Sequence, residues 1–70
     1  MHSSIRTIVA DDHMVVRAGL RKLLEMDPEM LVVGEAVEAL ETVRLVNEHW
    51  PDVLVLDIQM PGMTFADIIR

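Results

Sequence analysis

Cysteine is absent from this chain of 70 residues, and aromatic side chains make up only 3% of it. Without cysteine, neither disulfide bonds nor thiolate zinc sites are available, which fits a reducing cytoplasm. Basic residues are also few, because six Lys and Arg against twelve Asp and Glu give a formal net charge of -6. Nucleic-acid phosphates are normally contacted by clustered Lys and Arg. We therefore expect no direct nucleic-acid contact by this segment.

Long apolar runs are missing too, although 51% of the residues are hydrophobic. No run approaches the roughly 18 apolar residues of a membrane span, and the N-terminus has no apolar core behind a basic start. We expect a cytoplasmic protein with no membrane partner. Seventy residues make at most one domain. A chain this short buries only about 60% of the surface that its unfolded form exposes, so its stability should be marginal.

The stretch from Val53 to Met63 reads VLVLDIQMPGM and carries the clearest signal in the chain. Its Val/Leu run predicts a strand from Val53 to Asp57 that is buried on both faces, as in parallel sheets. The strand ends in an acid, which is costly to desolvate. Asp57 is therefore the first functional candidate, and the alternative is an ordinary strand terminator.

The chain before this strand alternates between strand and helix patterns. Strands are predicted at Ile5 to Ala10 and at Leu31 to Val33, the second closed by Gly34. A helix is predicted from Met14 to Met26, begun by Asp12 or His13, since an Asp side chain can cap the first turn. Its apolar face has helical spacing and comprises Val16, Leu20, Leu23 and Leu24.

Two more helices are predicted, one before and one after the Val53 to Asp57 strand in the sequence. The first runs through Ala39, Val43, Val46 and Trp50, and Pro51 ends it. The second begins near Thr64, where Thr64 and Asp67 have the spacing of a helix cap, and the chain stops inside it.

Strand-helix-strand-helix-strand forms two right-handed crossover units, which build a parallel sheet. If the second crossover passes the first strand, the sheet order is 2-1-3 and the helices cover opposite faces. Open α/β sheets place their ligands at the carboxyl edge of such strands. Asp11, Asp12 and Asp57 should converge at this edge.

Three neighbouring carboxylates repel one another, so either one of them holds a proton or a cation neutralises them. A sparse all-oxygen set suits Mg²⁺, and an Asp beside Mg²⁺ can attack a phosphoryl group. Asp57 is best placed for that attack. The competing interpretation of Asp11 and Asp12 is a helix cap in a solvated loop. His13 is interpreted as a surface residue and is left out of the site.

Three segments, VADDH (Val9 to His13), GEA (Gly34 to Ala36) and PDVLVLDIQMPGM (Pro51 to Met63), resemble the first half of a response-regulator receiver domain. The resemblance is greatest to receivers that precede a LuxR-type helix-turn-helix DNA-binding domain. It implies a truncated flavodoxin-like fold, with residues 1–70 forming the N-terminal part of the full sheet order 2-1-3-4-5. It also implies a transcriptional regulator that binds DNA through an output domain outside this segment.

The same resemblance implies the role of each site residue. Asp57 would accept a phosphoryl group from a histidine kinase, and Asp12 would bind Mg²⁺ directly. Asp11 would assist as an acid of the metal site, and the Gln59 carbonyl would be a further ligand. The Ser or Thr of a receiver's fourth strand and the Lys of its fifth strand have no counterpart in these 70 residues.

That absence keeps a second hypothesis open, in which the chain is a degenerate receiver that acts only in assembly, without phosphorylation. A phosphatase of the haloacid dehalogenase type ranks low, because that family needs a second Asp where Gln59 stands. A nucleotide-binding fold ranks lower, because ADDH occupies the turn where a glycine-rich phosphate loop would lie. We expect no enzyme.

The third strand also suggests a partner. With no fourth strand beside it, the segment Val53, Leu54, Val55 and Leu56 would present an unpaired apolar edge, which can pair with another chain. Self-association through this edge, or through exchange of elements between two copies, is therefore predicted.

Overall fold

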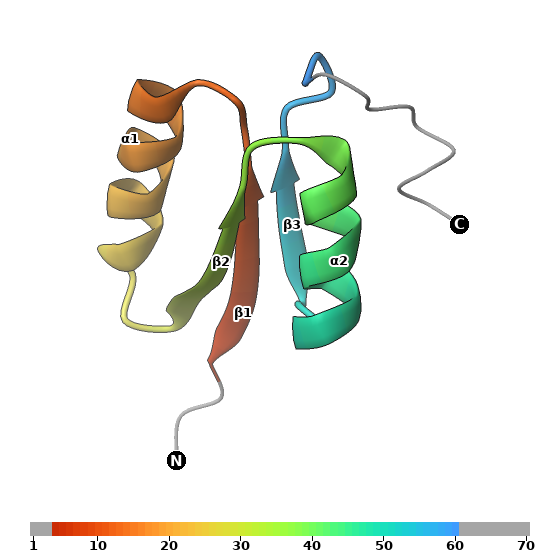
Figure 1. Cartoon of the computed structure of the whole chain (residues 1–70). Helices are drawn as coiled ribbons and strands as arrows, with labels where there is room; N and C mark the ends of the chain where they lie inside the picture. Colours follow the sequence, from red (N-terminus) through yellow and green to blue (C-terminus); the bar gives the residue numbers. More distant parts are fainter. Residues whose placement is uncertain (1–3, 61–70) are drawn as a thin grey trace.

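A computed structural model describes residues 4–60 of the chain (Figure 1). The elements in these residues are β1 (Ile5–Ala10), α1 (Met14–Glu25), β2 (Met30–Ala36), α2 (Ala39–His49) and β3 (Val53–Leu56). This is the predicted order of strands and helices. The helix expected from Thr64 lies outside the described residues. None of the described helices is long and apolar enough to cross a membrane.

The three strands form one parallel sheet in the order β2-β1-β3, as predicted. In the centre, β1 pairs with both neighbours, and Ile8 lies opposite Gly34 on one side and Leu54 on the other. The last four residues of β1, Thr7 to Ala10, are at most 1% exposed. The centre of the fold is therefore a strand that is covered on both edges and both faces.

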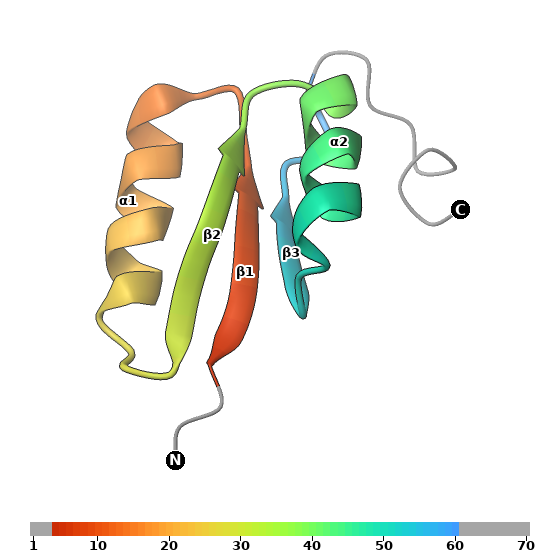
Figure 2. The ribbon, with the colours of Figure 1, turned by 60° about the horizontal axis from the view of Figure 1, so that its bottom comes forward.

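The two helices cover opposite faces of the sheet, which also confirms the prediction (Figure 2). Gly34 and Glu35 are adjacent in β2, and successive strand residues point to opposite faces. A Cβ atom at Gly34 would lie 3.4 Å from Leu45 of α2. The Glu35 side chain instead pairs with Arg17 of α1. α1 and α2 thus lie on the two sides of β2.

The second strand is longer than predicted. It runs from Met30 to Ala36, so the prediction that Gly34 closes it is wrong. The pairing with β1 shifts at this point, because Thr7 lies opposite Val32 while Ile8 lies opposite Gly34. Val33 is the extra residue of a β-bulge, and β2 continues beyond it. Gly34 does not end the strand; it lets Leu45 of α2 approach the sheet closely.

The third strand is shorter and more exposed than predicted. It ends at Leu56, and Asp57 follows it. Val53 is 41% exposed, while Leu54 to Leu56 are only partly buried. Within residues 4–60, β3 has a strand partner along β1 alone. Full burial on both faces is therefore wrong for these residues, because β3 is only partly buried. It also lies at the edge of the described sheet.

The first helix also has less burial than its apolar spacing suggests. No residue of α1 is fully buried, and Leu23 is 67% exposed. The helix ends at Glu25, and His13 precedes its first turn without a side-chain capping hydrogen bond. Of the two residues predicted to begin the helix, His13 holds this position, and the predicted cap by the Asp12 side chain is wrong. The second helix ends at His49, and Trp50 takes a left-handed conformation with φ of 50° and 82% exposure.

Candidate metal centre

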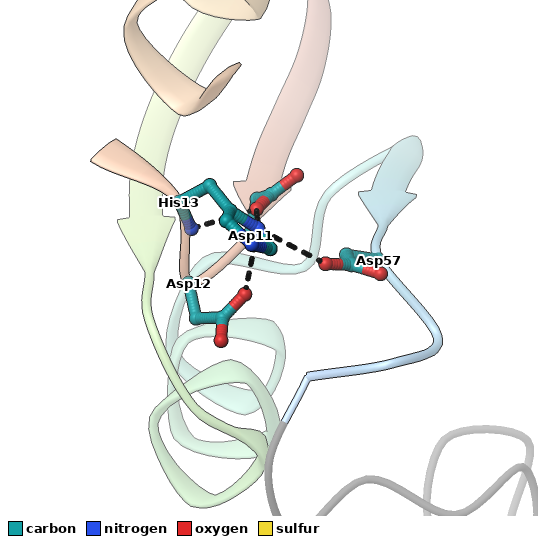
Figure 3. Close-up of side chains that lie close together, drawn as sticks. All are labelled: Asp11, Asp12, His13 and Asp57. Carbon is teal, nitrogen blue, oxygen red and sulfur yellow. Dashed lines mark hydrogen bonds and ion pairs between the residues drawn. The ribbon is translucent and has the colours of Figure 1, made fainter. Parts of the chain in front are cut away.

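Backbone hydrogen bonds tie the ends of the three strands together. The Asp57 amide donates to the Ala10 carbonyl at 2.9 Å, and the Asp11 amide donates to the Ala36 carbonyl at 3.0 Å. Because the strands are parallel, all three end at the same edge of the sheet. The acids that follow β1 and β3 are thereby held side by side, as the sequence predicts (Figure 3).

The cluster at this edge contains Asp11, Asp12, Asp57 and His13. Each offers one ligand atom, and these atoms all lie within 4.8 Å of one another. The side chains of Asp11 and Asp57 are 10% and 20% exposed, whereas that of Asp12 is 33% exposed. Two unit charges about 4 Å apart repel by about 4 kcal/mol at an effective dielectric constant of about 20. Such a group of carboxylates needs a nearby positive charge.

His13 supplies a positive charge when it is protonated. Its Nδ1 atom lies 3.0 Å from Asp11 Oδ1, 3.0 Å from Asp12 Oδ1 and 3.7 Å from Asp57 Oδ2. His13 is not among the site residues that the sequence predicts, and its side chain is 66% exposed. The signal that could have placed it there is its position directly after the acid pair.

Asp11 and His13 shift each other's pKa. The backbone N–H of His13 donates to Asp11 Oδ1 at 2.8 Å, and this bond is the main reason why the pKa of Asp11 lies below its ordinary value. The hydrogen bond to Asp11, followed by the charge of Asp12, raises the pKa of His13 above its ordinary value. The carboxylates therefore favour an imidazolium at position 13.

One carboxylate oxygen of Asp57 faces the cluster, and the other accepts a backbone hydrogen bond. Its Oδ1 accepts the backbone N–H of Gln59 at 2.9 Å, while its Oδ2 is the atom nearest His13. The turn after β3 thus fixes the carboxylate and directs one oxygen toward Asp11 and Asp12. Gln59 is exposed. The ligand role of its carbonyl oxygen stays a prediction.

The residues present fit a Mg²⁺ ion. Three carboxylates at one edge match the few acidic ligands with which this hard cation is usually bound. The His13 nitrogen fits it less well, since Mg²⁺ prefers oxygen. The His13 side chain is 66% exposed and therefore has room to turn outward. Asp11, Asp12 and Asp57 would hold the ion in its place.

A second charged group lies beside the site, between α1 and β2. The Glu35 carboxylate pairs with Arg17 Nε at 2.9 Å and also with Arg21, which has a further partner in Glu25. The same Arg17 donates from Nη1 to the Asp11 carbonyl at 3.0 Å. Neither Arg17 nor Arg21 is among the site residues that the sequence predicts. Arg17 connects Glu35 to the loop that carries the acids, whereas Arg21 pairs with Glu35 and Glu25.

Known proteins match both the sequence and this structure. The family profile of the response regulator receiver domain covers residues 7–70. The chain is 48% identical over 59 residues to the transcriptional regulatory protein LiaR of Bacillus subtilis, a match that covers 84% of this chain and 28% of LiaR. It is 43% identical over 67 residues to protein-glutamate methylesterase/protein-glutamine glutaminase 2 of Shewanella oneidensis, covering 91% of this chain and 19% of that protein.

A solved structure agrees. The signal receiver domain of NarL from Mycobacterium tuberculosis superimposes with a TM-score of 0.88 at 38% identity, covering 94% of this chain and 53% of that chain. Fold and acidic edge define a receiver-type α/β module. This chain belongs to the response regulator receiver family, whose members act in two-component signalling.

The matches cover only part of the length of each relative. The chain spans between 18% and 31% of the curated relatives that it matches. Those relatives include transcriptional regulators and methylesterases.

The Glu35 ion pairs predict a dependence of stability on acid pH. Arg21, with Arg17 beside it, holds the pKa of Glu35 below its ordinary value of about 4.5. A lowered folded-state pKa stabilises the fold above the unfolded-state pKa, and this contribution is lost as the pH falls through the folded-state value. We expect Glu35→Gln to be less stable than the parent at pH 7 and to lose less stability on acidification below about 4.5.

Urea unfolding at neutral and acid pH measures this difference. Glu29→Gln, which removes an exposed carboxylate in the turn before β2, is the matched control and should follow the parent protein. Parallel pH curves for Glu35→Gln and the parent would contradict the assignment.

Proposed function

We propose that this chain is the phospho-accepting part of a response regulator, in which Asp57 takes a phosphoryl group from a histidine kinase. The observation that carries the proposal is the position of Asp57. It follows β3 directly, it is fixed through Gln59 N–H, and its free oxygen faces two further acids. Membership of the receiver family supports the same role.

The chemistry follows from these contacts. Asp57 Oδ2 attacks the phosphorus of a phosphohistidine, a P–O bond forms, and the P–N bond to the imidazole breaks. The product is an acyl phosphate on Asp57. A Mg²⁺ ion held by Asp11, Asp12, Asp57 and the Gln59 carbonyl would supply positive charge for the phosphoryl oxygens. His13 would make room for such an ion by turning out of the cluster, while its backbone N–H holds Asp11 Oδ1 in place.

The biological output lies outside these 70 residues. Similarity to LiaR and to a LuxR-family regulator favours a transcriptional role through a DNA-binding domain. We expect the chain to act in the cytoplasm, where a histidine kinase presents its phosphoryl group.

Substitution of the acceptor tests the proposal. The parent chain should bind beryllofluoride, a phosphoryl mimic, when Mg²⁺ is present, and Asp57→Asn should lose this binding because the amide is a poor nucleophile and ligand. Backbone amide NMR spectra report the change at residues near the cluster. Asp27→Asn, at the opposite end of the sheet in the turn after α1, is the control and should behave like the parent.

The result can also exclude the proposal. A parent chain that shows no Mg²⁺-dependent change with beryllofluoride leaves the alternative, a degenerate receiver that serves assembly alone. An Asp57→Asn variant that responds as the parent does would place the acceptor elsewhere.

Self-association is a second proposed property, favoured by the exposure of β3. The strand pairs only with β1 among the described residues, and Val53 is 41% exposed. An apolar strand edge is a template for another strand. Two copies could join edge to edge along β3 or exchange elements.

A lysine at the edge should prevent this pairing, since charged edge residues oppose strand addition. We expect sedimentation to show dimers for the parent chain and monomers for Val53→Lys. Val15→Lys is the matched control, because Val15 is 80% exposed on α1, away from the β3 edge. A parent chain that sediments as a folded monomer at micromolar concentration would contradict the proposal, as would equal effects of the two lysines.

A further inference from the structure

Arg17 of α1 makes two separate contacts that meet at the acidic edge. Its Nε atom donates to Glu35 Oε1 at 2.9 Å, and its Nη1 atom donates to the Asp11 backbone carbonyl at 3.0 Å. The side chain is only 17% exposed. A planar guanidinium can make two such contacts at once because its donors form a rigid fork. Arg17 therefore joins β2 to the loop that carries Asp11 and Asp12.

The contact to Asp11 is made to the main chain and leaves the carboxylate free of arginine. The Asp11 amide is held by Ala36, so this residue is fixed through both of its backbone polar groups. Its side-chain Oδ1 is free to accept the His13 amide and to face the cluster. The position of the first acid thus depends on an arginine four residues after His13.

Glu35 explains why this arginine stays away from the carboxylates. A guanidinium beside three acids would be attracted into the cluster and would compete with a bound cation. Glu35 offers it a carboxylate on the other side, at the interface of α1 and β2. Arg21 shares Glu35 but makes no contact with Asp11 in the part of the chain that the structure describes. The two arginines therefore differ in one relevant contact.

We propose that Arg17 is a positioning residue for the cation site and that Glu35 holds its guanidinium off the site carboxylates. This inference rests on the proposed binding of Mg²⁺ by Asp11, Asp12 and Asp57. Groups that orient metal ligands from outside typically change metal affinity about 10-fold to 100-fold when they are removed. Arg17 is such a group, since it fixes the backbone of a ligand residue and does not touch the ion.

The charge of Arg17 and its contact with Asp11 have opposite effects on Mg²⁺ affinity, which makes the inference testable. Removal of a positive charge near a cation site by itself strengthens Mg²⁺ binding. Loss of the anchor on Asp11 weakens it. Arg17→Met keeps the length of the side chain and removes both the charge and the anchor. Arg21→Met removes the same charge and a Glu35 contact, but leaves the Asp11 carbonyl bond intact.

Calorimetric titration of the 70-residue chain with Mg²⁺ measures both effects. We expect Arg17→Met to bind Mg²⁺ about 10-fold more weakly than the parent, the lower end of the range for such outer groups. Arg21→Met should bind as tightly as the parent or more tightly. Equal or tighter binding by Arg17→Met would overturn the inference.

Two further measurements keep the test decisive. Amide hydrogen exchange without Mg²⁺ should show lost protection at Asp11 and His13 in Arg17→Met only, while Ile8 in the buried centre stays protected. If the parent binds no Mg²⁺, the proposed metal function fails, and the exchange result still decides whether Arg17 positions the loop. If Arg17→Met unfolds, Arg17→Lys decides, because it keeps the charge but lacks the fork. Full Mg²⁺ affinity and full protection in that variant would reject the role of Arg17.

Discussion

The pairing of β1 with strands on both of its edges is the constraint on which the rest of the structure depends. Its residues from Thr7 to Ala10 are at most 1% exposed. Its hydrogen bonds to β2 and β3 set the register of both neighbours. Because Asp11 follows β1 and Asp57 follows β3, the register that buries the strands also brings the carboxylates together. The fold and the acidic site have the same cause.

The carboxylates of the site repel one another, and basic residues elsewhere in the molecule offset this repulsion. Two basic residues lie near the acids of the site: His13, which precedes α1 and is charged when protonated, and Arg17, one turn later. His13 occupies the place where a cation would bind, whereas Arg17 stays behind the backbone, paired with Glu35. A bound metal ion would replace the charge of His13, whereas Arg17 would stay in its place. The helix after β1 therefore contributes both the exchangeable charge and the fixed support.

Sequence alone predicts the order of the elements, the 2-1-3 sheet and the convergence of Asp11, Asp12 and Asp57. These features depend on short-range patterns and on the handedness of crossover connections, both of which a sequence records. Gly34 is different, because its role is set by Leu45 of α2, a contact between distant residues. The same applies to Arg17, which is not part of the predicted apolar face of its helix and whose partners lie in β2 and in the loop after β1. Burial of β3 and α1 depends on neighbours that a local pattern does not specify.

The central claim is that the ends of β1 and β3 form a binding site for a divalent cation. A titration of the chain with Mg²⁺, followed by the backbone amide NMR signals of every residue, tests it most directly. The account predicts saturable shifts at Asp11 to His13 and at Asp57 to Gln59, with no change in the turn from Asp27 to Glu29 at the other end of the sheet. Signals at the acidic edge that stay unmoved at millimolar Mg²⁺, or shifts spread evenly over the chain, would contradict it.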